Sequence, residues 1–222
     1  MQFAGRPSWR FGYGNGNCSH LLAALFARDS ARLAIPPAPD VPPSLASEWL
    51  AGEPAAALSV LSEADLAAAT DQWLAWWRAL LVDTVAEAGS RPPADADAAA
   101  ILAWVGSRHA AVFDPPDFDS LAAAPELRVV VRATQEAWPR GLPDRPGSFN
   151  YQLIRFIAEA TAAYYGVSME AIDATAHVLD VRGSWWHLAG PGCVLCSPGA
   201  TADMAVAEQM LRAVFASRLG RT

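Results

Sequence analysis

Residues 176–196, AHVLDVRGSWWHLAGPGCVLC, decide the fold class, because the hydrophobic pattern changes here from a helical period to a period of two. Short runs of alternating apolar and polar side chains lie on either side of Arg182-Gly183-Ser184. This pattern predicts a β-hairpin over residues 176–189 with its turn at these three residues. Gly190-Pro191-Gly192 predicts a further turn, and Cys193 to Cys196 a third strand.

The hydrophobic pattern predicts helices over most of the remaining chain. Apolar residues recur at helical spacing over residues 19–33, 62–89, 149–165 and 204–215, and residues 98–109 fit a further helix. These helices and the strands that follow them predict an α+β fold, with a mainly helical body and a small antiparallel β-sheet near the C-terminus.

The second of these helices carries the strongest local signals. Ser62 followed by Asp65 is an N-terminal capping pattern. Trp73, Trp76 and Trp77 form an aromatic stripe at helical spacing, which is typical of a buried core rather than of a cofactor site. We therefore expect these tryptophans to pack inside the molecule.

Three segments give other expectations. We expect irregular structure over residues 1–17. Val129 to Val131 fit either a buried strand or part of a helix over residues 126–138. A proline-rich loop at 139–147 is a possible boundary. We expect a single domain over residues 1–222, in which a helical part (1–138) and a C-terminal α/β part (148–222) are possible subdivisions.

The composition restricts the class of protein. The 222 residues are 53% hydrophobic and 18% charged, with a net charge of −7. Binding to nucleic acid or to an anionic membrane requires clustered cationic surface, so neither partner is expected. No signal peptide and no uninterrupted apolar run of membrane-spanning length is visible. The sequence predicts a cytoplasmic protein whose substrate or partner is a protein or peptide.

The segment Gly16-Asn17-Cys18 is the strongest candidate for chemistry. It follows Gly12 and Gly14 and precedes the helix predicted from Ser19. The partial positive charge at a helix N-terminus favours the thiolate form of a cysteine, which is the nucleophile in acyl transfer. A buried apolar cysteine is the other interpretation of Cys18.

A cysteine nucleophile needs a base, and histidine is the usual one. His20 lies two residues after Cys18 and points elsewhere on the helix, and His109 ends a predicted helix. His177 and His187 lie on the two strands of the predicted hairpin. We take Cys18 and His177 as the candidate catalytic pair, with Asn15 and Asn17 as side-chain donors for an oxyanion hole.

These two segments resemble a known superfamily. Gly16-Asn17-Cys18 before a helix resembles the nucleophile segment of papain-like cysteine peptidases, including ovarian-tumour-type deubiquitinases and papain-like toxin deamidases. Ala176-His177-Val178, running on to Trp185-Trp186, resembles the histidine hairpin of transglutaminase-like enzymes. The resemblance implies a cysteine on a helix N-terminus, a histidine on an adjacent strand, and a peptidase, deamidase or acyltransferase activity without a cofactor.

The chain departs from this superfamily at the third catalytic residue. Where the family places an aspartate after the histidine hairpin, this chain has Leu188-Ala189-Gly190. Asp180 falls on the face of its strand opposite to His177. Asp173 and Asn150 remain as residues that tertiary contact would have to bring to the histidine, so the orienting residue is unassigned.

Two other functions stay open. His187, Cys193 and Cys196 have ligand types that suit zinc, but cysteines three apart on a strand face opposite sides, so no metal site is expected. The first alternative is a non-catalytic intracellular protein-binding domain that uses the tryptophan-rich segments or the hairpin. The second is a domain stabilised by zinc at His187, Cys193 and Cys196.

Overall fold

The computed structural model describes residues 8–13, 19–50, 58, 61–89, 99, 121–135 and 149–220. Asn15, Asn17 and Cys18 therefore lie outside the described residues. So do His109 and nearly all of the helix predicted over residues 98–109.

The α+β class is confirmed, and helices form most of the described structure. The helices are α1 (Ser19–Ser30), α2 (Glu63–Gly89), α4 (Pro125–Gln135), α5 (Tyr151–Tyr165), α6 (Pro198–Ala202) and α7 (Met204–Leu219), with 3-10 turns η1 (Ser47–Leu50) and η3 (Met169–Ala171). The strands are β1 (Ser8–Tyr13), β2 (Asp173–Val178), β3 (Trp186–Gly190) and β4 (Cys193–Cys196).

The sheet is mixed rather than antiparallel, and the hairpin predicted over residues 176–189 is wrong. The strand order is β1-β2-β4-β3, with β2 parallel to both β1 and β4, and only β3 antiparallel to β4. The antiparallel hairpin is instead β3–β4, which turns at Pro191 and Gly192, where Gly192 has a φ of 70°. Residues 179–185 carry the chain away from β2, so that β4 takes the place beside it.

The first strand also corrects an expectation. Residues 8–13, predicted to be irregular, form β1 along the outer side of β2, with Gly12 opposite His177 and Tyr13 opposite Val178. The signal was present in the sequence, because Trp9, Phe11 and Tyr13 alternate with other residues at the period of a strand. A strand from the beginning of the described chain thus joins the sheet formed by its C-terminal part.

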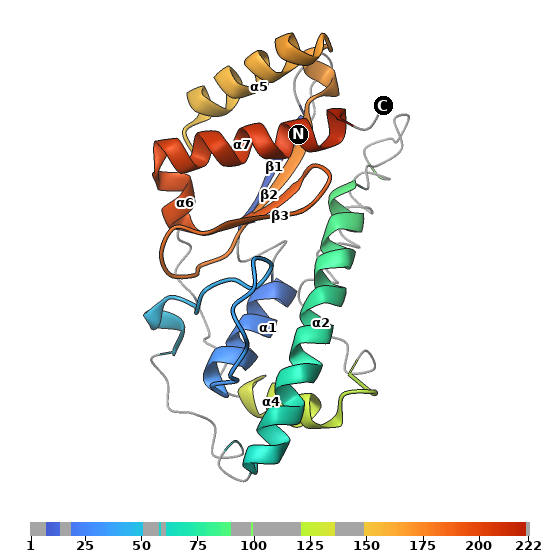
Figure 1. Ribbon diagram of the computed structural model, residues 1–222, viewed down its shortest axis with the longest axis vertical. Coiled ribbons are helices and arrows are strands. Elements are labelled where there is room, and N and C mark those ends of the chain that lie inside the picture. The colour runs from blue at the N-terminus through green and yellow to red at the C-terminus, as the bar shows by residue number, and fades with distance from the viewer. Residues whose placement is uncertain are drawn as a thin grey trace.

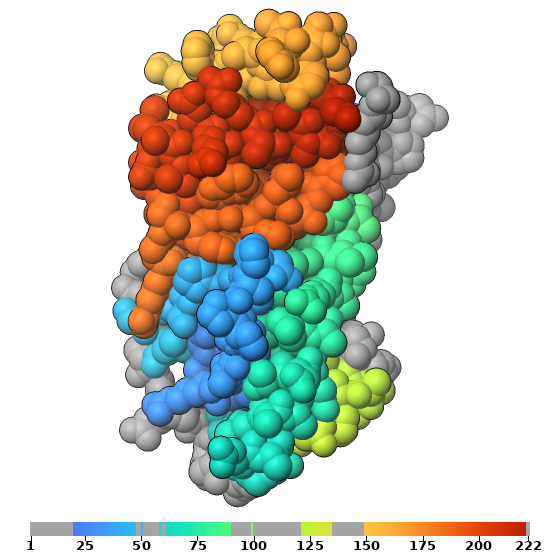
Figure 2. Space-filling view, viewed as in Figure 1, coloured from blue at the N-terminus to red at the C-terminus, as the bar shows by residue number. Residues whose placement is uncertain are grey.

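Helices cover both faces of the sheet (Figure 1). Apolar residues of α5 and α7 pack with Ala176, Val178 and Val194 on one face, whereas residues of α1, α2 and α4 share a core with Leu195 on the other. Figure 2 shows the orange band of the sheet segment between the red and yellow helices and the blue and green helical body. None of the described helices is both long and apolar enough to cross a membrane.

Capping residues set the ends of the long helices. The Ser62 hydroxyl accepts from the Asp65 amide at 3.1 Å, and the Asp65 carboxylate accepts from the Ser62 amide at 2.9 Å, which confirms the predicted cap of α2. Asn150 caps α5, and Gly166 ends it in the left-handed conformation at a φ of 65°. Val129 to Val131 belong to helix α4 and not to a strand.

The tryptophan stripe of α2 is buried, as predicted. Trp73 and Trp77 stack with their ring centroids 5.5 Å apart, and both are fully buried. Their indole N–H groups donate to the backbone carbonyls of Ala24 (2.7 Å) and Asp40 (2.8 Å). Because each buried donor has an acceptor, the stripe stabilises the packing of α2 on α1 and on residues 36–43, a proline-rich connector that follows α1.

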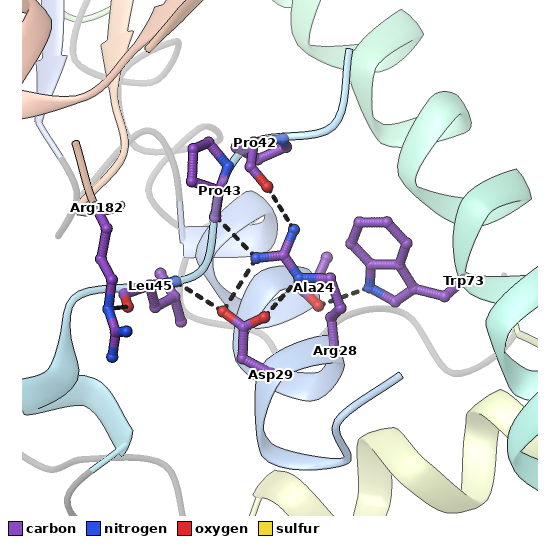
Figure 3. A network of polar contacts seen from close by, with 8 residues as sticks. All are labelled: Ala24, Arg28, Asp29, Pro42, Pro43, Leu45, Trp73 and Arg182. Atoms are coloured by element: carbon purple, nitrogen blue, oxygen red, sulfur yellow. Dashed lines mark hydrogen bonds and ion pairs between the residues drawn. The ribbon is translucent and has the colours of Figure 1, made fainter. Parts of the chain in front are cut away.

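A buried ion pair holds that connector in place (Figure 3). Arg28 and Asp29, neighbours on α1, pair at 2.6 Å, and the Arg28 guanidinium also donates to the carbonyls of Pro42 (2.7 Å) and Pro43 (2.9 Å). The Asp29 carboxylate accepts from the Leu45 amide at 2.7 Å. These contacts fix residues 42–45, which we call the strap, on α1.

The strap in turn holds the chain that leaves β2. Leu45 forms an antiparallel bridge with Val181, and the Arg182 side chain donates to the Leu45 carbonyl at 3.1 Å. The Arg182 amide donates to the Ser44 carbonyl at 2.9 Å. The network therefore connects α1 to the carboxyl end of β2, which carries His177.

Candidate functional site

His177 lies near the carboxyl end of β2, in a row that crosses the whole sheet. Its strand neighbours are Gly12 on β1 and Leu195 on β4, and Leu195 in turn lies opposite His187 on β3. His177 is only 4% exposed. Its neighbour on β1 is thus a glycine.

The row faces the helical body. Residues in register on neighbouring strands share a face of a sheet, so His177 lies on the same face as Leu195. Leu195 is fully buried in the core that it shares with Leu21, Leu22 and Leu25 of α1. The imidazole of His177 is therefore on the face of the sheet that α1 and α2 cover.

The candidate nucleophile and oxyanion donors fall in the short connection that precedes α1. Asn15, Asn17 and Cys18 lie between Tyr13, the last residue of β1, and Ser19, the first residue of α1. None of the three is among the described residues. Strand β1, which leads into this connection, pairs in parallel with β2, which carries His177.

The remaining two cysteines lie buried in β4. Cys193 is in register with Thr175, and Cys196 with Val178, so the two thiols lie on opposite faces of the sheet. Burial raises the pKa of the Cys193 thiol to about 12, although the nearby Arg218 guanidinium opposes this shift. Burial also raises the pKa of Cys196. Both are protonated at neutral pH and are poor nucleophiles and poor metal ligands.

His187 lies on the same face of the sheet as His177, but on the edge strand β3. Two strand spacings, about 9–10 Å, separate it from His177, with Leu195 between them. Its ring stacks on Trp185 at 6.4 Å, and partial burial lowers its pKa against the opposing field of Asp40. Within the part of the chain that the structure describes, no three histidine, cysteine or acidic side chains come together as a metal site.

Neither residue considered for orienting His177 is placed to do so. The Asp173 carboxylate pairs with Arg218 of α7 and lies four residues before His177, about 13 Å along the strand. The Asn150 side chain accepts from the amides of Gln152 (2.9 Å) and Leu153 (3.3 Å) as the N-cap of α5. Both side chains have structural partners, so the third catalytic position stays unassigned.

His20 has a defined place that its sequence position did not reveal. Its Nε2 lies 3.1 Å from the Thr84 hydroxyl of α2, and burial lowers its pKa, with the Asp83 carboxylate opposing part of the shift. The signal in the sequence was its position four residues before Ala24, a fully buried residue on the side of α1 that packs inward. His20 thus joins the first turn of α1 to α2.

Comparison of the chain with protein-family models, with curated proteins and with solved structures gave no match.

Proposed function

We propose that this protein is a cysteine-dependent amide or acyl hydrolase or transferase, in which Cys18 is the nucleophile and His177 the general base. The observation that carries the proposal is the pairing of His177 with Gly12. It puts a buried imidazole beside the strand whose chain continues directly into Cys18 and α1. The substrate class that fits this chemistry is a peptide or protein amide, or another acyl donor.

The position of the histidine supports the proposal. Gly12 and His177 are about 4.8 Å apart as neighbours on parallel strands, and six residues after Gly12 the chain reaches Cys18. The connection enters α1, whose apolar side packs in the same core as Leu195. Substrate sites in sheets that contain parallel strands commonly lie beyond the carboxyl ends of those strands, where this connection begins.

Elimination among the other residues also supports the proposal. Of the three cysteines, Cys193 and Cys196 are buried and hold their protons tightly. Of the described histidines, His20 is bonded to Thr84, and His187 lies across the sheet beyond Leu195. Among the described histidines, these observations leave His177 as the base for Cys18.

The proposed reaction follows from these roles. The Cys18 thiolate attacks the carbonyl carbon, and the His177 imidazolium gives its proton to the leaving amine. Asn15 or Asn17, with the Cys18 amide, would donate to the oxyanion. Water or an amine acceptor then attacks the thioester, and His177 takes a proton from this attacking group. The acyl group leaves Cys18, and the thiolate is regenerated.

Thiol labelling tests the proposal without knowledge of the substrate. At pH 6, a cysteine with an ordinary pKa of about 8.5 is less than about 1% thiolate, whereas a nucleophile paired with imidazolium is mostly thiolate. We expect iodoacetamide to modify Cys18 alone in the native protein. His177→Ala should slow this labelling about 100-fold at pH 6, because the thiolate loses its counter-ion.

His187→Ala is the matched control, since His187 lies on the same row of the sheet and should leave the labelling rate unchanged. His177→Gln, which keeps a polar side chain of similar size, replaces His177→Ala if the alanine variant fails to fold. Equal labelling rates in the wild type and in the folded His177 variant would contradict the proposal and leave the protein-binding function as the alternative.

A further inference from the structure

The connector that follows α1 has three exposed prolines, Pro36, Pro37 and Pro39. The apolar side chains on either side of them, Ile35 and Val41, are partly buried and pack against the core that α1 shares with α2. The chain is therefore anchored at these two residues, and the prolines between them lie on the surface. We call Pro36, Pro37 and Pro39 the proline ridge.

The proline rings hold the backbone of the ridge in an extended conformation. A proline fixes its own φ at about −65° and keeps the residue before it out of the helical region. Pro36 meets both conditions, since Pro37 follows it, and Ala38 is restricted by Pro39 in the same way. Residues 33–38 form no helix, turn or bend, so this segment takes the polyproline II conformation. Because that helix has three residues per turn, Pro36 and Pro39 lie on the same side of it.

Contacts before and after the ridge hold it in place. The Leu33 amide donates to the Arg28 carbonyl at the end of α1, at 3.0 Å. The Trp77 indole of α2 donates to the Asp40 carbonyl at 2.8 Å, and residues 38–41 form a hydrogen-bonded turn. A partner that binds the ridge therefore loses little free energy in ordering it.

The hydrogen-bonding groups of the ridge define the chemistry of its partner. A proline has no N–H, so the ridge presents carbonyl acceptors and no backbone donors. The carbonyls of Pro36 and Pro37 accept no hydrogen bond from any of the described residues. A partner must therefore supply hydrogen-bond donors together with flat apolar surface. Tryptophan and tyrosine side chains provide both, and they line the grooves that bind proline-rich segments.

We propose that the proline ridge is a docking site for a partner domain with an aromatic-lined groove that binds polyproline II segments. Pro36 and Pro39 fill two neighbouring pockets of the groove, since their spacing is the PxxP spacing that such grooves accept. Donors of the groove bind the carbonyls between them. This surface uses neither Cys18 nor His177, so it is independent of the proposed catalytic chemistry.

Calorimetric titration of the whole chain with isolated SH3, WW and EVH1 domains tests the docking site. We expect at least one of these domains to bind with a Kd below about 1 mM, and a decaproline peptide to compete with the chain for it. Pro36→Ala and Pro39→Ala should each weaken the binding about tenfold, because each removes two methylene groups that the groove buries. Pro43→Ala, at an exposed proline outside the ridge, is the matched control and should leave the binding unchanged.

Pro36→Ala and Pro39→Ala test the same groove independently, so either variant decides the matter if the other fails to fold. The proposal is overturned if none of the domains binds, or if binding persists in an excess of decaproline. Equal effects of the ridge variants and of Pro43→Ala would also overturn it. Self-association of the chain that decaproline disrupts would assign the ridge to a second copy instead of a partner domain.

Discussion

At Gly190 the backbone of β3 lies directly against Val85 of α2. A methyl group added at this position would meet Val85 Cγ1 at 2.6 Å and Cγ2 at 2.9 Å, well inside normal contact distances. We expect Gly190→Ala to lower the free energy of unfolding by about 1–3 kcal/mol, because either the strand or the helix must move. Chemical denaturation measures this loss.

Two further variants isolate the cause of that loss. Val85→Ala should relieve the clash, so the double variant should recover most of the stability that Gly190→Ala loses. At Gly89, the nearest atom that a new methyl group would meet among the described residues is Arg218 Nη2 at 3.8 Å, so Gly89→Ala should change stability by less than about 0.5 kcal/mol. A large loss at Gly89, or no recovery in the double variant, would contradict this explanation.

Among the elements, the junction between β4 and α6 depends on one hydroxyl. Ser197 is fully buried, and its Oγ accepts from the amides of Trp185 (2.9 Å) and Ala200 (3.1 Å) and donates to the Gly183 carbonyl at 2.9 Å. It therefore caps α6 and also fixes the loop that leads into β3. We expect Ser197→Ala to cost about 2–3 kcal/mol, because three backbone groups, one buried and two partly buried, lose the partner that a fully buried hydroxyl gives them.

Asn150→Ala gives the comparison for that prediction. Asn150 caps α5 with two amide contacts, but at an exposed position where water can replace the lost acceptor. Its removal should cost about 1 kcal/mol. If thermal unfolding shows equal losses for the two variants, the burial of Ser197 does not contribute as we expect.

At the scale of the whole molecule, the Arg28–Asp29 pair connects the helical body to the sheet through the strap. Asp29→Ala would leave the Arg28 guanidinium, which is almost fully buried, without its counter-charge. We expect a loss of about 3–5 kcal/mol in the free energy of unfolding. The exposed pair of Arg78 and Asp40, at 3.3 Å, is the control, and Arg78→Ala should cost less than about 1 kcal/mol.

Local signals predicted most of the helices. The Ser62 cap, the tryptophan stripe and Gly166 each depend on residues a few positions apart, so each of these helix signals can be read from a short stretch of sequence. The order of the strands has no such local signal. Gly183 does take a turn conformation, with a φ of 74°, yet the tight hairpin forms at Gly192. Strand pairing depends on which face of each strand packs against which of the two hydrophobic cores, and this is a tertiary property.

The candidate site shows the same division between local and tertiary information. His177 was identified from its motif, and the structure puts it on the buried face of a strand beside Gly12. Its pairing with β1 required contact between the two ends of the described chain, which no local pattern encodes. The bond from His20 to Thr84 was missed for the same reason, since these residues are 64 positions apart.

The pairing of β1 with β2 has a consequence for synthesis on the ribosome. Roughly 160 residues separate Tyr13 from Asp173, so β1 leaves the ribosome long before the strand that it pairs with. At about 5–20 residues per second, this delay is roughly 10–30 s. During that time the apolar Trp9, Phe11 and Tyr13 of the nascent chain have no sheet to join. Chaperones that bind short hydrophobic segments would therefore have β1 as a target during this time.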